Sequence, residues 1–126
     1  MSEVAPPRVL VADDDPILHR LLELNFRVAG IEMESVGRGD DALVRVAASP
    51  PDVLVLDATM PGMDGHEVFR RLREEPATAT LPVVFLSGRA PEEFAGYEDD
   101  QVRVVTKPFD PSELVRIVRE AIGRDG

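Results

Sequence analysis

The sequence predicts an α/β fold, a doubly wound five-stranded parallel sheet with helices on both faces. Two observations carry this prediction. Short runs of continuous apolar residues alternate with stretches whose apolar residues recur at helical spacing, and the connections between them are brief. Continuous apolar runs are typical of strands buried on both faces, as in parallel sheets. Such sheets bind ligands outside the carboxyl ends of their strands, so we expect the functional residues there.

The first half of the chain contains two strand–helix units. Val9–Ala12 is a strand, and Asp15 then caps a helix that ends at Gly30. The second unit consists of a weaker strand over 31–36 and a helix over Asp40–Ala48. This order of elements is that of a parallel sheet with helical crossovers.

The second half repeats the pattern. Val53–Leu56 is the strongest strand of the chain. A helix from Asp64 to Glu75 follows, and Glu67 stands three residues after the cap as in a capping box. The remaining expected elements are strands over 81–86 and 102–106, a weak helix over Ala90–Asp100, and a last helix after Asp110.

Composition excludes several classes of function. The chain has 14 Lys+Arg against 24 Asp+Glu, a formal net charge of −10 that repels phosphate backbones, so no direct nucleic-acid binding is expected. Cysteine is absent, which excludes disulfides and thiolate catalysis. No apolar run approaches the roughly 20 residues that span a bilayer. We therefore expect no membrane insertion and a cytoplasmic location.

The length fits a single domain. The small and polar residues 1–7 end in two prolines and are expected to form a flexible N-terminal tail, followed by one domain over 8–124. No effector domain is expected within 126 residues, so an effector would be another chain.

Polar side chains follow four of the predicted strands. Asp13, Asp14 and Asp15 follow the first strand, Asp57 the third, Ser87 the fourth and Lys107 the fifth. Several carboxylates at one edge repel each other unless a cation compensates their charge. Oxygen ligands with room for water suit Mg²⁺ better than zinc, so the sequence predicts a magnesium site.

Asp57 stands alone at the end of the most hydrophobic strand. An exposed carboxylate there can act as an oxygen nucleophile toward phosphorus and form an acyl phosphate. The added negative charge and acceptor oxygens require a cation, a hydroxyl and N–H donors nearby. Mg²⁺ and Lys107 would supply the positive charge, and Ser87 would supply the hydroxyl.

These motifs together resemble the receiver domain of two-component response regulators, a flavodoxin-like (CheY-like) fold. The resemblance covers Arg8 to Gly123 and rests on the segments 9–16, 57–65, Ser87–Gly88 and 107–109. It implies that Asp57 is the phosphoacceptor and that Asp14, Asp57 and the backbone carbonyl of Thr59 bind Mg²⁺ directly. It also implies that Asp13 holds a metal-bound water, that Lys107 pairs with the phosphoryl group, that Ser87 is the mobile hydroxyl, and that the Lys107–Pro108 peptide is cis.

The resemblance implies a signalling function. A sensor histidine kinase or phosphotransfer protein would donate the phosphoryl group, and phosphorylation would change affinity for an unknown downstream protein. The domain would not be an enzyme beyond catalysing its own phosphorylation and dephosphorylation. His19 and His66 are expected to be surface residues of helices, without a role as phosphodonors.

The sequence also departs from the family pattern. Receiver domains usually carry Tyr or Phe three residues before the lysine, where this chain has Val104. A valine cannot swing as a ring does, so the aromatic half of the switch is missing or lies elsewhere, with Tyr97 as one candidate. Lys107 follows Ser87 by only 20 residues, which shortens the weak helix.

Two alternative functions therefore stay open. One is a pseudo-receiver that acts as a constitutive protein-binding module with a degraded switch. The other is a Mg²⁺-dependent phosphohydrolase with Asp57 as nucleophile. No acid that could protonate a leaving group stands two residues after Asp57, which argues against the hydrolase.

Overall fold

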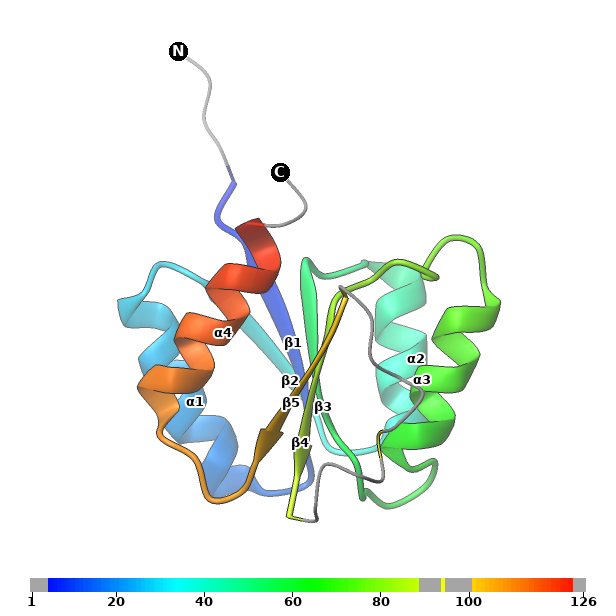
Figure 1. The fold of residues 1–126 in the computed structure, drawn as a ribbon, viewed down its shortest axis with the longest axis horizontal. Helices are drawn as coiled ribbons and strands as arrows, with labels where there is room; N and C mark the ends of the chain where they lie inside the picture. The colour runs from blue at the N-terminus through cyan, green and yellow to red at the C-terminus, as the bar shows by residue number, and fades with distance from the viewer. Residues whose placement is uncertain (1–4, 89–93, 95–100, 124–126) are drawn as a thin grey trace.

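The computed structural model describes residues 5–88, 94 and 101–123. Within them, five parallel strands form one sheet in the order β2-β1-β3-β4-β5. Helices α1 and α4 cover one face and α2 and α3 the other (Figure 1). The predicted fold class, a doubly wound parallel sheet, is confirmed. The helix expected over Ala90–Asp100 falls almost wholly outside the described residues.

The observed elements follow the predicted order. The strands are β1 (Arg8–Ala12), β2 (Glu32–Val36), β3 (Val53–Asp57), β4 (Val83–Ser87) and β5 (Val102–Thr106). The helices are α1 (Pro16–Val28), α2 (Gly39–Ala48), α3 (Gly65–Glu74) and α4 (Pro111–Gly123).

The fourth strand begins later than the prediction of 81–86. The Leu81 amide donates to the Thr78 carbonyl at 3.2 Å and closes a turn, and Pro82 has no N–H to give to the ladder. The strand therefore starts at Val83 and extends through Ser87. Its last residue is therefore Ser87, whose hydroxyl lies at the carboxyl end of β4, beside the end of β3.

The predicted helix caps are present. Asp15 Oδ1 accepts hydrogen bonds from the amides of Ile17 at 2.9 Å and Leu18 at 3.4 Å. Asp64 Oδ1 accepts from the Glu67 amide at 3.0 Å, and Asp110 Oδ1 accepts from the Ser112 amide at 2.9 Å. Each cap satisfies N–H groups that have no partner within their own helix, which fixes where the helix starts.

The sheet separates two hydrophobic clusters. Alternate residues of a strand point to opposite faces, so Val9 and Val11 join the cluster under α1 and α4, whereas Leu10 and Ala12 join the one under α2 and α3. All five residues of β3 and of β4 are buried. Burial on both faces explains the continuous apolar runs of the sequence.

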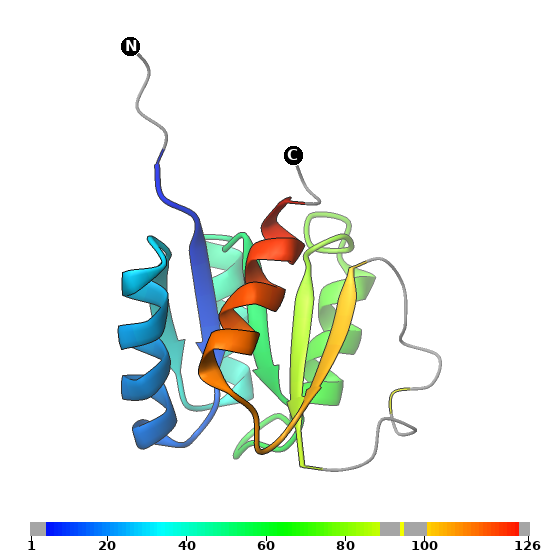
Figure 2. The same cartoon turned by 60° about the vertical axis from the view of Figure 1, so that its left-hand side comes forward.

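The connections that follow β1, β3 and β5 meet at one edge of the sheet, the lower edge in Figures 1 and 2. The sheet is parallel, so every strand delivers its carboxyl end to this edge. The fold thereby brings together residues that lie far apart in the chain.

Replacement of the buried Phe26 should unfold the protein far more readily than replacement of its neighbour Val28. Phe26 is fully buried between α1 and the sheet, and Val28 is 84% exposed. We expect Phe26→Ala to lower the free energy of unfolding by about 3–5 kcal/mol and Val28→Ala to change it by less than about 0.5 kcal/mol, measured by chemical denaturation. Equal losses in both variants would contradict this packing.

Candidate functional site

Three carboxylates gather at the carboxyl edge of the sheet. Asp13 follows β1 and Asp57 ends β3, and these two strands are hydrogen-bonded neighbours. Asp13 is buried and Asp14 is exposed. Asp57 is only 7% exposed, so the expectation of an exposed carboxylate at this position is wrong. One carboxylate oxygen from each of the three lies within 4.8 Å of the others. The prediction that these three carboxylates lie together at one edge of the sheet is confirmed.

Lys107 bridges two of these carboxylates. Its Nζ donates to Asp13 Oδ2 at 3.1 Å and to Asp57 Oδ2 at 3.4 Å. Lys107 follows β5, which β4 separates from β3, so the side chain spans a strand to reach Asp57. Its backbone amide donates to the Ser87 carbonyl at 2.7 Å, and the Lys107–Pro108 peptide is cis, as the resemblance implied.

Backbone amides hold the second oxygen of each buried carboxylate. The Asp15 amide donates to Asp13 Oδ1 at 2.9 Å, and the Thr59 amide donates to Asp57 Oδ1 at 3.2 Å. Asp13 and Asp57 are thus each oriented by one amide and by the ammonium of Lys107. Oriented, charge-assisted contacts of this kind fix a side chain more firmly than an exposed ion pair does.

The charges at the site shift two pKa values. Burial raises the pKa of Asp57, and the negative charge of Asp13 raises it further. The hydrogen bond from the Thr59 amide and the positive charge of Lys107 lower it, but the net result is a raised pKa. Burial alone would lower the pKa of Lys107, but Asp13 and Asp57 outweigh it and raise that pKa. The lysine therefore keeps its positive charge, and the site retains more negative than positive groups.

The other predicted site residues lie around this cluster. Ser87 is 2% exposed at the end of β4, one position beyond the residue that pairs with Asp57. Thr59 is exposed in the connection from β3 to α3. Val104 is half-buried on β5 opposite Phe85 and packs against the cluster under α2 and α3. Tyr97 lies outside the described residues.

The expectation that His19 and His66 are surface residues is wrong, because both are half-buried. The His66 ring stacks on Phe85 at 5.9 Å and on Phe94 at 5.2 Å between centroids. Phe85 and Phe94 also contact each other at 4.8 Å. The available signal in the sequence was the spacing of three residues between His66 and Phe69, which places both on one side of a helix.

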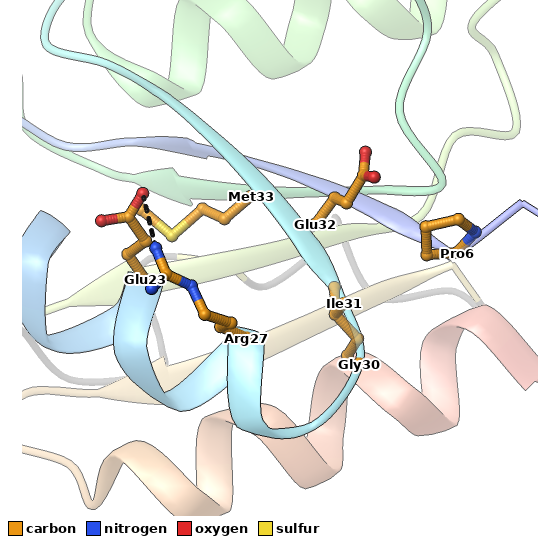
Figure 3. A pocket seen from close by; sticks show the side chains of 7 residues that line it. All are labelled: Pro6, Glu23, Arg27, Gly30, Ile31, Glu32 and Met33. Atoms are coloured by element: carbon orange, nitrogen blue, oxygen red, sulfur yellow. Dashed lines mark ion pairs between the residues drawn. The ribbon is translucent and has the colours of Figure 1, made fainter.

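A hollow of about 450 Å³ lies away from this site. It opens between the end of α1 and the start of β2, and Pro6, Arg27 and Met33 are among its lining residues (Figure 3). The exposed Glu23–Arg27 pair, 4.0 Å apart, flanks it. The start of β2 is the opposite edge of the sheet from Asp57, so this hollow is not part of the carboxylate site.

Comparison with known proteins decides the family. The model of the response regulator receiver domain matches residues 9–119. The chain belongs to this family. Receiver domains are signalling modules of two-component systems rather than classical enzymes, bind Mg²⁺ at an acidic pocket, and interact with histidine kinases or phosphotransfer proteins. No helix in the described part of this receiver is long and apolar enough to cross a membrane.

Individual relatives agree with this assignment. The phosphate regulon transcriptional regulatory protein PhoB of Rhizobium meliloti is 36% identical over 94% of this receiver and 53% of its own length. A 14.6 kDa protein of Leptolyngbya boryana is 36% identical over 95% of this chain and 93% of its own. The receiver domain of Francisella response regulator 1452 superposes with a TM-score of 0.86 at 30% identity, covering 95% of this chain and 99% of its own. The chain spans about half the length of the first curated relatives it matches.

Removal of the Asp57 charge should stabilise the receiver near neutral pH when no divalent cation is present. Its pKa in the folded state is raised above the ordinary value of 3.8, so the ionised side chain opposes folding once the pH exceeds that value. Asp57→Asn should therefore unfold at a higher temperature than the unaltered protein at pH 7. The gain should shrink as the pH falls and vanish below about 3.8, where the unfolded chain also holds the proton.

Asp41→Asn is the matched control, because it removes one negative charge outside the site. Asp41 is exposed in the first turn of α2, where a negative charge favours the helix. Asp41→Asn should give no gain at any pH. A thermal scan in which Asp57→Asn is less stable than the unaltered protein at pH 7 would contradict the charge balance described above.

Proposed function

We propose that this receiver accepts a phosphoryl group on Asp57 from a phosphohistidine of a sensor histidine kinase or phosphotransfer protein, with Mg²⁺, and that phosphorylation changes its affinity for a downstream protein. One observation carries the proposal. The Asp57 carboxylate lies 3.4 Å from the Lys107 ammonium and within 4.8 Å of the ligand oxygens of two further carboxylates. The proposal takes residues 8–124 as the receiver and 1–7 as its tail, and places the receiver in the cytoplasm.

The residues at the site fit a hard divalent cation. Carboxylate and carbonyl oxygens are the ligands that Mg²⁺ prefers, and the surplus negative charge favours a cation. Asp14, Asp57 and the carbonyl of Thr59 would hold the ion, with Asp13 acting through a bound water. When bound, Mg²⁺ neutralises charge on the transferring phosphoryl oxygens.

The chain's own residues then perform the transfer. A carboxylate oxygen of Asp57 attacks phosphorus as the phosphorus–nitrogen bond of the donor breaks, and the bonding electron pair stays on the imidazole nitrogen. The Thr59 amide holds the other oxygen of Asp57, which leaves Oδ2 for the attack. The Lys107 ammonium moves with the charge from the carboxylate to the phosphoryl oxygens, and the Ser87 hydroxyl donates to one of them.

A surface beside the site suits a helical donor. Four apolar side chains lie exposed along α1 at spacings of four, three and four residues: Ile17, Leu21, Leu24 and Val28. This spacing gives one stripe along the helix, whose cap is Asp15. A partner helix with its own apolar stripe could dock there and present a phosphohistidine to Asp57.

Phosphorylation by a small donor tests the chemistry. Incubation with acetyl phosphate and Mg²⁺ should add the mass of one phosphoryl group, with acetate as the leaving group, and Asp57→Asn should gain none. The exposed Asp41→Asn variant should be phosphorylated normally. Lys107→Met should react more slowly by about 10²- to 10³-fold, because it removes a positive charge aimed at the developing charge. Incorporation that persists in Asp57→Asn, or none in the unaltered protein, would refute the proposal.

A constitutive binding module is the second candidate, and Val104 is the observation that favours it. Its small side chain lies opposite Phe85, packs against the cluster under α2 and α3, and offers no ring that could rotate outward. The contacting rings of His66, Phe85 and Phe94 connect β4, which ends at Ser87, with α3 and so provide another place where a change could be seen.

Beryllofluoride, which mimics the phosphoryl group, separates the two candidates. If the receiver switches, binding of beryllofluoride together with Mg²⁺ should shift the NMR resonances of the His66 ring and alter amide exchange beyond the site. If the module is constitutive, the changes should stay at residues that contact the ligand. Multiple turnover of an aryl phosphate would instead support the phosphohydrolase, which lacks an acid at Thr59.

A further inference from the structure

The connection between β3 and α3, residues 58–64, supplies Thr59 to the site and is closed at its base. The Gly65 amide donates to the Ala58 carbonyl at 3.0 Å, and the Ala58 amide donates to the Leu86 carbonyl of β4 at 3.0 Å. A Cβ atom on Gly65 would lie 2.2 Å from the Asp57 carbonyl oxygen. The base of this connection is therefore packed directly on the backbone of Asp57.

The first residue of α2 packs against the far side of the same connection. Gly39 is buried, and a Cβ atom there would lie 1.8 Å from the Met63 carbonyl oxygen and 2.7 Å from its carbon. It would also lie 3.0 Å from Val68 Cγ2. The backbones of α2 and of the connection thus approach so closely that no side chain fits between them.

A second contact covers the turn within the connection. Gly62 has a φ of +77°, a conformation that favours glycine. The Arg38–Asp40 ion pair, 3.1 Å long, lies over this turn. A Cβ atom on Gly62 would be 2.6 Å from Arg38 Nη2 and 2.8 Å from Asp40 Oδ1. Residues 38–40 therefore contact the connection at two successive positions.

We propose that the start of α2, residues 38–40 with Gly39 at its centre, positions the connection that carries Thr59 and thereby sets the affinity of the site for Mg²⁺. This inference rests on the proposed function, which places the Thr59 carbonyl among the metal ligands. Gly39 touches neither metal nor phosphoryl group. It is a positioning residue that acts through Met63.

A side chain at position 39 would force the connection to move, and the movement would fall on the part of the connection that is not held at its base. In Gly39→Ala, the Met63 carbonyl oxygen and the new Cβ must separate by roughly 1.6 Å more to reach ordinary van der Waals contact. The base of the connection is held by Ala58 and Gly65, so the displacement falls on the residues between them, including Thr59. Outer contacts that orient metal ligands typically change metal affinity by about 10- to 100-fold when they are altered.

Calorimetric titration of Mg²⁺ into Gly39→Ala tests the inference. We expect the dissociation constant to rise at least about tenfold, although alanine is the better helix former. Acetyl phosphate labelling should recover largely at saturating Mg²⁺, because Asp57 and Lys107 are unchanged. Gly37→Ala is the matched control: its Cβ would make only ordinary contacts, 3.9 Å from Asp14 Cα and 4.0 Å from the Asp13 carbonyl oxygen. It should bind Mg²⁺ like the unaltered protein.

The outcomes separate the two proposals. No Mg²⁺ uptake by the unaltered protein would refute the proposed function. Normal uptake by the unaltered protein and equal affinity in a folded Gly39→Ala, checked by circular dichroism, would refute only the positioning role.

If Gly39→Ala does not fold, amide exchange of the unaltered protein decides. Mg²⁺ with beryllofluoride should slow exchange at residues 58–64 and also at the Ala42 amide, which donates to the Arg38 carbonyl at 3.1 Å in the first turn of α2. Protection confined to residues 58–64 would overturn the inference.

Discussion

The bridge from the Lys107 ammonium to the carboxylates of Asp13 and Asp57 is the interaction on which the site depends. Two acidic side chains that are almost fully buried stand side by side, an arrangement that burial and mutual repulsion both oppose. The fold tolerates it because Lys107 reaches across β4 and because an amide holds each carboxylate. The bridge is also incomplete, since three carboxylates face one ammonium. This surplus of negative charge is what suits the site to a cation and to a reaction that moves charge.

The hydrophobic core determines where these charges meet. Every residue of β3 and β4 is buried, so neither strand can shift in register without exposing apolar surface. Asp57 and Ser87 are the last residues of these two strands, and their positions are therefore as well fixed as the core itself. The three glycines around the connection from β3 to α3 extend this rigidity by letting backbones approach one another.

Much of this arrangement could be predicted from the sequence because it follows from periodicity. Continuous apolar runs located the buried strands, and the parallel topology then placed Asp13, Asp57, Ser87 and Lys107 at one edge. The caps at Asp15 and Asp64 are local hydrogen bonds and were equally accessible.

The features that escaped prediction are contacts between elements far apart in the chain. The ring stack of His66 on Phe85 depends on how α3 lies on the sheet. The approach of Gly39 to Met63 depends on how α2 meets a loop 24 residues later. The contact from Lys107 to Asp13 depends on the reach of a flexible side chain across two strands, β4 and β3. No local pattern specifies such geometry. The start of β4 was misplaced for a different reason: the predicted strand included Pro82, which has no N–H to give to the ladder.

The temperature of unfolding as a function of MgCl₂ concentration tests most directly whether surplus carboxylate charge defines this site. A cation that binds only the folded protein must raise that temperature in a saturable way. We expect such a rise at neutral pH for the unaltered receiver, much larger than in NaCl of equal ionic strength and strongly reduced in Asp14→Asn. An identical response to both salts, or a full response in Asp14→Asn, would contradict a cation site built from these carboxylates.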